Sequence, residues 1–180
     1  MKNSVSDAPT FQLESLAREA LEKIRAQGQL LCFAESCTGG MLASLITGIP
    51  GASDVFWGGI VSYQNSAKTK LLNVPEALLR QHGAVSREVA RAMALGGASQ
   101  LLKAHPGAKA ICISTTGIAG PDGGTATHPV GLCELGLALP DQSVTSRQIQ
   151  APASFNRHQN QAFFTHHALR FLIEHRADSV

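Results

Sequence analysis

The chain has 180 residues, of which 44% are hydrophobic and 16% are charged, and these values fit one globular domain with a sizeable core. The formal net charge is only +2 and Lys and Arg form no dense run, so we expect no nucleic-acid partner. No apolar run approaches the ~18 residues of a membrane span or has the form of a signal peptide. We therefore expect a cytoplasmic protein with no membrane partner.

The first half of the chain predicts helices and strands in alternation. Residues 1–10 are expected to be a disordered or loosely ordered tail, and residues 11–176 a single domain. Apolar residues at helical spacing then predict a helix from Leu13 to Ile24 that ends near Gly28. The next predicted elements are a buried strand at 30–35, a helix that Thr38 caps and Gly48 ends, and a strand at 55–64.

The second half predicts helices first and then a hairpin. Short helices are expected at 66–72 and 75–82, followed by a longer helix that begins after Ser86 and runs to Leu101, although Gly96 and Gly97 disfavour it. The remaining predicted elements are a strand at 108–116, two hairpin strands at 131–139 and 143–150, and a final helix from about Asn156. This order of elements predicts an α/β sandwich with a mixed sheet.

The segment ESCTGG, residues 35–40, stands where a buried strand hands over to a helix. Ser36 and Cys37 are both candidate nucleophiles, and the residues by themselves do not choose between them. The main-chain N–H groups around Thr38, Gly39 and Gly40 are candidates for holding an oxyanion or an anionic ligand. The alternative interpretation is a capped helix start with glycines that permit a tight turn.

The segment YQNSAK begins at Tyr63, the single tyrosine of the chain, and ends at Lys68. A serine hydroxyl needs a base at neutral pH, and a lysine that burial keeps neutral can serve as one. Tyr63 is then a candidate for orienting or relaying the proton. The alternative is that Tyr63 covers the sheet while Lys68 and Lys70 are solvated helix residues.

The glycine-rich segment TTGIAGPDGG covers residues 115–124 and follows a buried strand. Its main chain is open to close approach by a ligand, which suits a phosphate or a planar base. It lacks the Lys of a P-loop and the spacing of a dinucleotide fingerprint, and an ordinary long turn is the alternative.

Cysteines and histidines have no spacing typical of metal ligands. The four cysteines form no CxxC pair and three of them lie in apolar strand-like segments, which is typical of reduced thiols. The seven histidines form no HxxH or HExxH pattern, so we expect no metal site.

The three segments, in this order and with HGAVSREVARAMA between the second and third, resemble the CinA-type nicotinamide-nucleotide amidohydrolases over most of the chain. The resemblance implies a three-layer α/β/α sandwich that hydrolyses the carboxamide of nicotinamide mononucleotide to nicotinate mononucleotide and ammonia, with no cofactor. It places the nucleophile on Ser36, the base on Lys68 and an assisting phenol on Tyr63. We also expect a homo-oligomer. The substrate-binding residues that we expect are Thr38, Gly39, Gly40, Asn65, Thr116, Gly117, Gly120 and Arg157.

A catalytically silent nucleotide-binding paralogue with the same cleft is the alternative function. The presence of Ser36, Tyr63 and Lys68 together favours the enzyme, because a binding protein needs no neutral lysine beside a serine. A carboxylate at contact distance would raise the pKa of Lys68 and prevent it from acting as a base. We therefore expect Glu35 to point away from Lys68 and to accept main-chain hydrogen bonds in the turn.

Overall fold

The computed structural model describes residues 8–175 of the chain, and within that range it contains six α-helices, one short 3-10 helix and five strands. The helices are α1 (Ala8–Ala26), α2 (Met41–Thr47), α3 (Asn65–Leu72), α4 (Glu76–His82), α5 (Arg87–Ala104) and α6 (Arg157–Glu174), with the 3-10 helix at Ala52–Asp54. The strands are β1 (Leu30–Glu35), β2 (Phe56–Val61), β3 (Ala110–Gly117), β4 (Leu132–Ala138) and β5 (Val144–Gln150).

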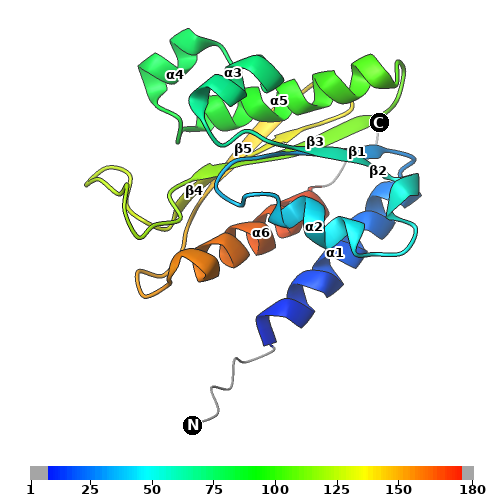
Figure 1. Ribbon diagram of the computed structural model, residues 1–180. Helices are drawn as coiled ribbons and strands as arrows, with labels where there is room; N and C mark the ends of the chain where they lie inside the picture. Colours follow the sequence, from blue (N-terminus) through cyan, green and yellow to red (C-terminus); the bar gives the residue numbers. More distant parts are fainter. Residues whose placement is uncertain (1–7, 176–180) are drawn as a thin grey trace.

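The strands form one mixed sheet in the order β2-β1-β3-β4-β5. The β1 strand pairs in parallel with both β2 and β3, whereas β4 is antiparallel to β3 and to β5. Helices α1, α2 and α6 cover one face of the sheet and α3, α4 and α5 cover the other (Figure 1). The predicted three-layer α/β/α sandwich is confirmed.

The register of the parallel strands brings the three chemical segments of the sequence to one edge of the sheet. Glu35, the last residue of β1, is paired with Val61 of β2 and with Thr115 of β3. Because parallel strands end at the same edge, the loops that follow these strands meet there. Residues that are 80 positions apart in the chain, Glu35 and Thr115, are therefore brought together at this edge.

The sheet separates two apolar cores. The larger one lies between the sheet and helices α1, α2 and α6, and it includes Phe33, Leu135 and Phe164. The smaller one lies between the sheet and α5 and includes Val89 and Met93. Neighbouring residues of the buried strands supply both cores, because successive side chains of a strand point to opposite faces. This explains why β1, β3 and β4 are buried along nearly their whole length.

Two glycines allow α5 to pack closely against its neighbours. A Cβ atom at Gly96 would lie 2.0 Å from the carbonyl oxygen of Leu72, the last residue of α3, and one at Gly97 would lie 2.5 Å from Cys112 Sγ on β3. Glycine inside a helix costs about 1 kcal/mol relative to alanine. Close packing against α3 and the sheet explains why α5 contains glycine at both positions.

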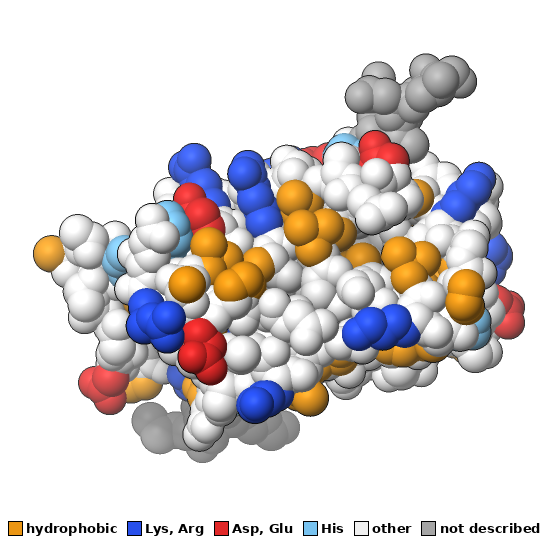
Figure 2. All heavy atoms as spheres, turned by 90° about the horizontal axis from the view of Figure 1, so that it is seen from above, with side chains coloured by type: hydrophobic (Ala, Val, Ile, Leu, Met, Phe, Trp, Pro, Cys, Tyr) orange, Lys and Arg blue, Asp and Glu red, His pale blue; other side chains and the backbone are white. Residues whose placement is uncertain are grey.

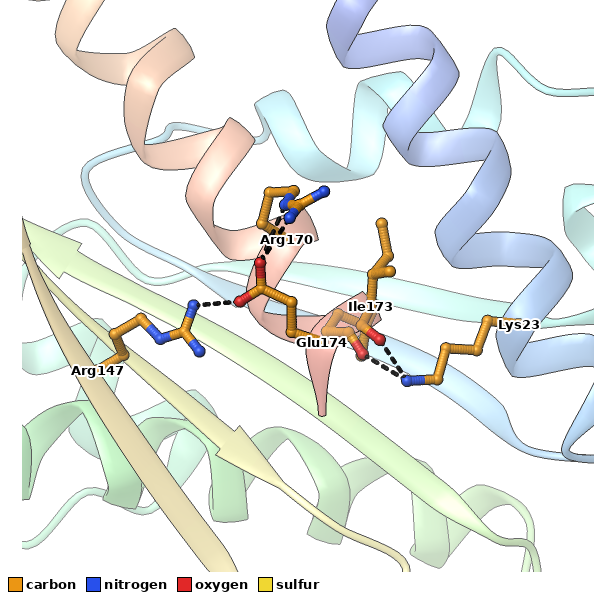
Figure 3. A network of polar contacts seen from close by, with 6 residues as sticks. Lys23, Arg147, Arg170, Ile173 and Glu174 are labelled. Atoms are coloured by element: carbon orange, nitrogen blue, oxygen red, sulfur yellow. Dashed lines mark hydrogen bonds and ion pairs between the residues drawn. The ribbon is translucent and has the colours of Figure 1, made fainter. Parts of the chain in front are cut away.

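The final helix is fixed at both ends. At its start, Asn156 accepts from the main-chain N–H of Gln159, and the Gln159 side chain accepts from the N–H of Asn156, which completes a capping box. At its end, Lys23 of α1 donates to the carbonyl oxygen of Ile173, and Glu174 accepts from both Arg147 and Arg170 (Figure 3). These contacts connect α6 to α1 and to β5, so the position of α6, which contributes to the site, is fixed relative to the sheet.

Several boundaries differ from the sequence-based prediction by one to five residues, and two of these differences have a clear physical reason. The α1 helix begins at Ala8, inside the segment predicted as a tail, and it includes Pro9, which is tolerated in the first turn because the N–H it lacks has no helical partner there. Residues 1–7 lie outside the described residues. The β2 strand ends at Val61, three residues earlier than predicted, because the chain must turn there to begin α3.

The face formed by α3, α4 and α5 carries Lys and Arg side chains that are spread over it, with groups of hydrophobic side chains between them (Figure 2). The large hydrophobic residues that are exposed among the described residues are Val61, Tyr63, Leu71 and Leu95. None of the helices within residues 8–175 combines the length and the apolar composition that crossing a membrane requires.

Candidate active site

The turn after β1 is organised by the buried carboxylate of Glu35. Its Oε2 atom accepts from Thr38 Oγ1 at 2.7 Å and from the N–H of Gly40 at 3.0 Å and Leu42 at 3.2 Å, while Oε1 accepts from the N–H of Ala43 at 3.0 Å. Glu35 therefore satisfies the first amides of α2 in the way that a capping side chain does. The expectation that Glu35 accepts main-chain hydrogen bonds is confirmed.

The prediction that Thr38 caps α2 is wrong. The residue before the helix is Gly40 with a φ of 97°, a conformation that favours glycine, and no side chain at that position caps the helix. Thr38 instead donates to Glu35 and lies 2.8 Å from Thr115 Oγ1. The acceptor that caps α2 is Glu35 at the end of β1. The Thr38 side chain instead connects the turn to Thr115 of β3.

The side chains of Ser36 and Cys37 point to different surroundings. Lys68 Nζ, from α3, donates to Ser36 Oγ at 2.9 Å. Cys37 belongs to the larger core, and its Sγ atom lies 3.7 Å from that of Cys133. The geometry thus pairs the hydroxyl, and not the thiol, with the candidate base.

Lys68 is only 1% exposed, and among residues 8–175 no carboxylate is a hydrogen-bond partner of its ammonium group. Besides Ser36, it donates to the carbonyl oxygen of Ser62 at 2.7 Å and, over a longer 3.4 Å, to that of Tyr63. Burial lowers the pKa of Lys68 from 10.5 to about 8, and the nearby Cys37 opposes this shift. A lysine with this pKa is partly neutral near pH 7 to 8, as a general base requires.

Tyr63 lies at the rim of the site and is 59% exposed. Its hydroxyl accepts a hydrogen bond at 2.9 Å from Arg157, the first residue of α6, which also donates to the carbonyl oxygen of Gly120 at 2.7 Å. Arg157 therefore links the loop after β2 to the glycine-rich loop after β3. The phenol contacts this arginine, whereas the main-chain carbonyl of Tyr63 contacts Lys68.

A cavity of about 150 Å³ lies between these groups. Of the predicted site residues, it brings together Ser36, Tyr63, Asn65, Lys68, Thr116, Gly117 and Arg157. The other residues that line the cavity are Cys37, Ala84, Val85 and Ala119.

Four predicted substrate-binding residues do not line the cavity: Thr38, Gly39, Gly40 and Gly120. The N–H of Gly39 donates to the carbonyl oxygen of Ser36 and that of Gly40 donates to Glu35, so both amides are engaged within the turn. In contrast, no acceptor is found among residues 8–175 for the N–H of Cys37 or of Thr38.

Sequence reasoning gave no role to Ser62, Ala84 or Val85. Ser62 acts through its carbonyl oxygen, which any residue type could supply, so no sequence signal marks it. Ala84 and Val85 come from the loop between α4 and α5 and lie within the HGAVSREVARAMA segment. Within residues 8–175 no group of three or more His, Cys, Asp or Glu side chains is arranged to hold a metal ion.

The fold and this site define an α/β/α sandwich protein with a buried serine–lysine pair at the carboxyl edge of its parallel strands. The family model described as the CinA C-terminal domain matches residues 13–175, and the chain belongs to this family. It is 49% identical over 133 residues to a CinA-like protein of Nostoc sp., covering 74% of this chain, and 46% identical over 163 residues to one of Chlorobium phaeovibrioides, covering 89%. The chain spans only 30% and 37% of the length of these two relatives.

Solved structures of competence/damage-inducible proteins have the same fold as this chain. The competence/damage inducible protein CihA of Agrobacterium tumefaciens matches with a TM-score of 0.81 and 36% identity, covering 90% of this chain and 94% of that one. The competence damage-inducible protein A of Klebsiella pneumoniae matches with a TM-score of 0.83 and 27% identity, covering 93% of this chain and 99% of that one.

Proposed function

We propose that this protein hydrolyses the carboxamide of nicotinamide mononucleotide, releasing ammonia and nicotinate mononucleotide. The observation that carries the proposal is the contact between Ser36 and Lys68, in which a lysine of lowered pKa lies 2.9 Å from a serine hydroxyl at a cavity. The choice of substrate rests on the resemblance of the three segments at residues 35–40, 63–68 and 115–124 to the nicotinamide-nucleotide amidohydrolases.

The chemistry begins with proton transfer between the two paired side chains. Neutral Lys68 accepts the proton of Ser36 as Oγ attacks the carboxamide carbon, and the resulting ammonium then protonates the departing ammonia. The product of this half-reaction is an ester on Ser36. A water molecule, deprotonated by Lys68, cleaves that ester and leaves the carboxylate.

The developing oxyanion needs donors that are not already engaged. The N–H groups of Gly39 and Gly40 donate within the turn, whereas those of Cys37 and Thr38 have no acceptor among residues 8–175. We assign the oxyanion to the amides of Cys37 and Thr38, which follow the nucleophile directly in the chain.

The small size of the cavity supports the proposal that only part of the substrate enters it. Ligand pockets usually measure about 300–1,000 Å³, so a cavity of about 150 Å³ has room for the pyridine carboxamide and leaves the ribose phosphate outside. Arg157 at the rim carries the positive charge that suits the phosphate group.

The test is ammonia release from nicotinamide mononucleotide by the purified chain without added metal. We expect release by the parent protein, none by Ser36→Ala, and normal release by Ser66→Ala, which changes an exposed serine on α3. Absence of ammonia from the parent protein, or its persistence in Ser36→Ala, would contradict the proposal. Activity that EDTA abolishes and zinc restores would contradict the metal-independent mechanism.

A further inference from the structure

Cys37, the residue after Ser36, forms a thiol pair with Cys133. Their Sγ atoms lie 3.7 Å apart, although the residues are 96 positions apart in the chain. Cys37 immediately follows Ser36, lines the cavity and is 4% exposed, while Cys133 lies on β4 and is fully buried. The serine–lysine chemistry uses neither sulfur atom.

A second thiol pair in the molecule provides a contrast. Cys32 and Cys112 are partners in the register of β1 and β3, and both belong to the smaller core against α5. Neither residue lines the cavity that contains Ser36. Both residues of this pair are held in the sheet, whereas Cys37 belongs to the turn after β1.

We propose that Cys37 and Cys133 are an oxidation site, at which a peroxide converts the two thiols to a disulfide and switches off Ser36. The disulfide itself does not depend on the proposed function, but its effect on turnover does. The oxidant belongs to the class of small hydroperoxides, such as hydrogen peroxide. Such a molecule is small enough for the cavity of about 150 Å³ that Cys37 lines.

The reaction balances in two steps. Cys37 sulfur attacks one peroxide oxygen, the O–O bond breaks, and the products are a sulfenic acid on Cys37 and one water molecule. Cys133 sulfur then attacks the Cys37 sulfur, and its proton leaves with the hydroxide as a second water. Two thiols are oxidised by two electrons and one peroxide is reduced. The thiol proton of Cys37 leaves with the water that forms in the first step.

The disulfide would move the turn and not the sheet. A disulfide places its sulfur atoms about 2.05 Å apart, so the pair must approach by roughly 1.7 Å from the observed 3.7 Å. Cys133 lies on β4, which is paired with β3 and β5, whereas Cys37 is outside any strand and its main chain has one hydrogen bond within residues 8–175, from Gln161 to its carbonyl oxygen. Displacement of a catalytic group by about 1 Å can cost 10²-fold in rate, and Ser36 is the adjacent residue.

The experiment treats the purified chain with hydrogen peroxide and reads both the cross-link and the amidase activity. Peptide mapping after alkylation is expected to find Cys37 joined to Cys133, with a loss of ammonia release of about 10²-fold that dithiothreitol reverses. Cys133→Ala should form no cross-link and should instead accumulate a dimedone-reactive sulfenic acid on Cys37. The matched control is Cys112→Ala, which should still form the cross-link. It changes an equally buried strand cysteine whose Sγ also donates to the next carbonyl oxygen.

The two readouts separate this inference from the proposed function. Recovery of Cys37 and Cys133 as separate alkylated residues after peroxide treatment overturns the oxidation site. A cross-linked protein that is as active as the reduced protein overturns the switch. A reduced protein that releases no ammonia contradicts the amidase proposal, while the mapping still tests the disulfide.

Discussion

Replacement of Lys68 by arginine separates a proton acceptor from a positive charge. Arginine keeps the charge but cannot be deprotonated in a protein. We expect Lys68→Arg and Lys68→Ala to lose activity to a similar degree, about 10²- to 10⁴-fold, the usual contribution of a general base. Lys70→Ala changes an exposed lysine on the same helix and should retain activity.

The expected pH profile follows from the pKa of Lys68. With a pKa of about 8 instead of 10.5, about one lysine in eleven is neutral at pH 7, compared with about three in ten thousand. The kcat/KM for ammonia release should therefore rise about tenfold per pH unit below pH 7 and level off above about pH 9. The assay is ammonia release from nicotinamide mononucleotide between pH 6 and about 10.5.

Two results would refute this reasoning. More than about a tenth of parental turnover in Lys68→Arg would mean that the position supplies only charge, since general-base loss should cost at least 10²-fold. A kcat/KM that continues to rise tenfold per unit up to about pH 10 would mean that burial does not lower the pKa of the base. Tyr63 would then be the next candidate base, although its hydroxyl is bonded to Arg157.

Four further predictions follow from the same site. Ser36→Ala should abolish turnover while Cys37→Ala keeps most of it, because the thiol lies in the core and the substitution leaves the main chain unchanged. Single-turnover assays on both variants test this, and an inactive Cys37→Ala would reverse the assignment of the nucleophile. Arg157→Ala should raise KM more than it lowers kcat, because the proposed contact with the phosphate group is the same before and during the reaction; an unchanged KM would leave Arg157 with only its contacts to Tyr63 and Gly120. Glu35→Gln should lower the free energy of unfolding in urea by about 1–3 kcal/mol, because an amide cannot accept all the hydrogen bonds of the turn; unchanged stability would contradict this. Because the folded pKa of Lys68 lies below 10.5, the stability of the parent relative to Lys68→Met should rise between pH 8 and 10.5 by up to about 3 kcal/mol; a constant difference in denaturation midpoints across that range would refute it.

Much of the fold could be predicted from local patterns. Ser86 caps α5 as expected, and α6 begins next to Asn156 as expected, because a hydroxyl or amide next to an apolar helical pattern is a local signal. The hairpin of β4 and β5 likewise follows from two strand-like segments that are joined by a short turn at Pro140 and Asp141. The cap of α2 was predicted wrongly, because the capping acceptor is Glu35, which belongs to the preceding strand and accepts from the amides of α2 across the turn.

The site could be predicted only in part. The paired positions of Ser36 and Lys68 followed from resemblance, since 32 residues separate them and no spacing rule joins them. The sequence could not indicate which amides are free, because the N–H groups of Gly39 and Gly40 are engaged by partners that only the folded turn supplies. Nor could it place the Tyr63 hydroxyl on Arg157, which lies 94 residues further along the chain.

The close contact between Gly96 of α5 and the end of α3 limits which substitutions the chain can accept. The helix that carries Lys68 ends against Gly96, where any side chain would meet the carbonyl oxygen of Leu72 at 2.0 Å. Neither glycine nor carbonyl takes part in chemistry, yet a larger residue at this position must push α3 and its lysine away from α5. In a library of random substitutions scored by turnover, Gly96 should therefore be as intolerant as the site residues, while exposed positions on the same helix, such as Arg91, accept many replacements.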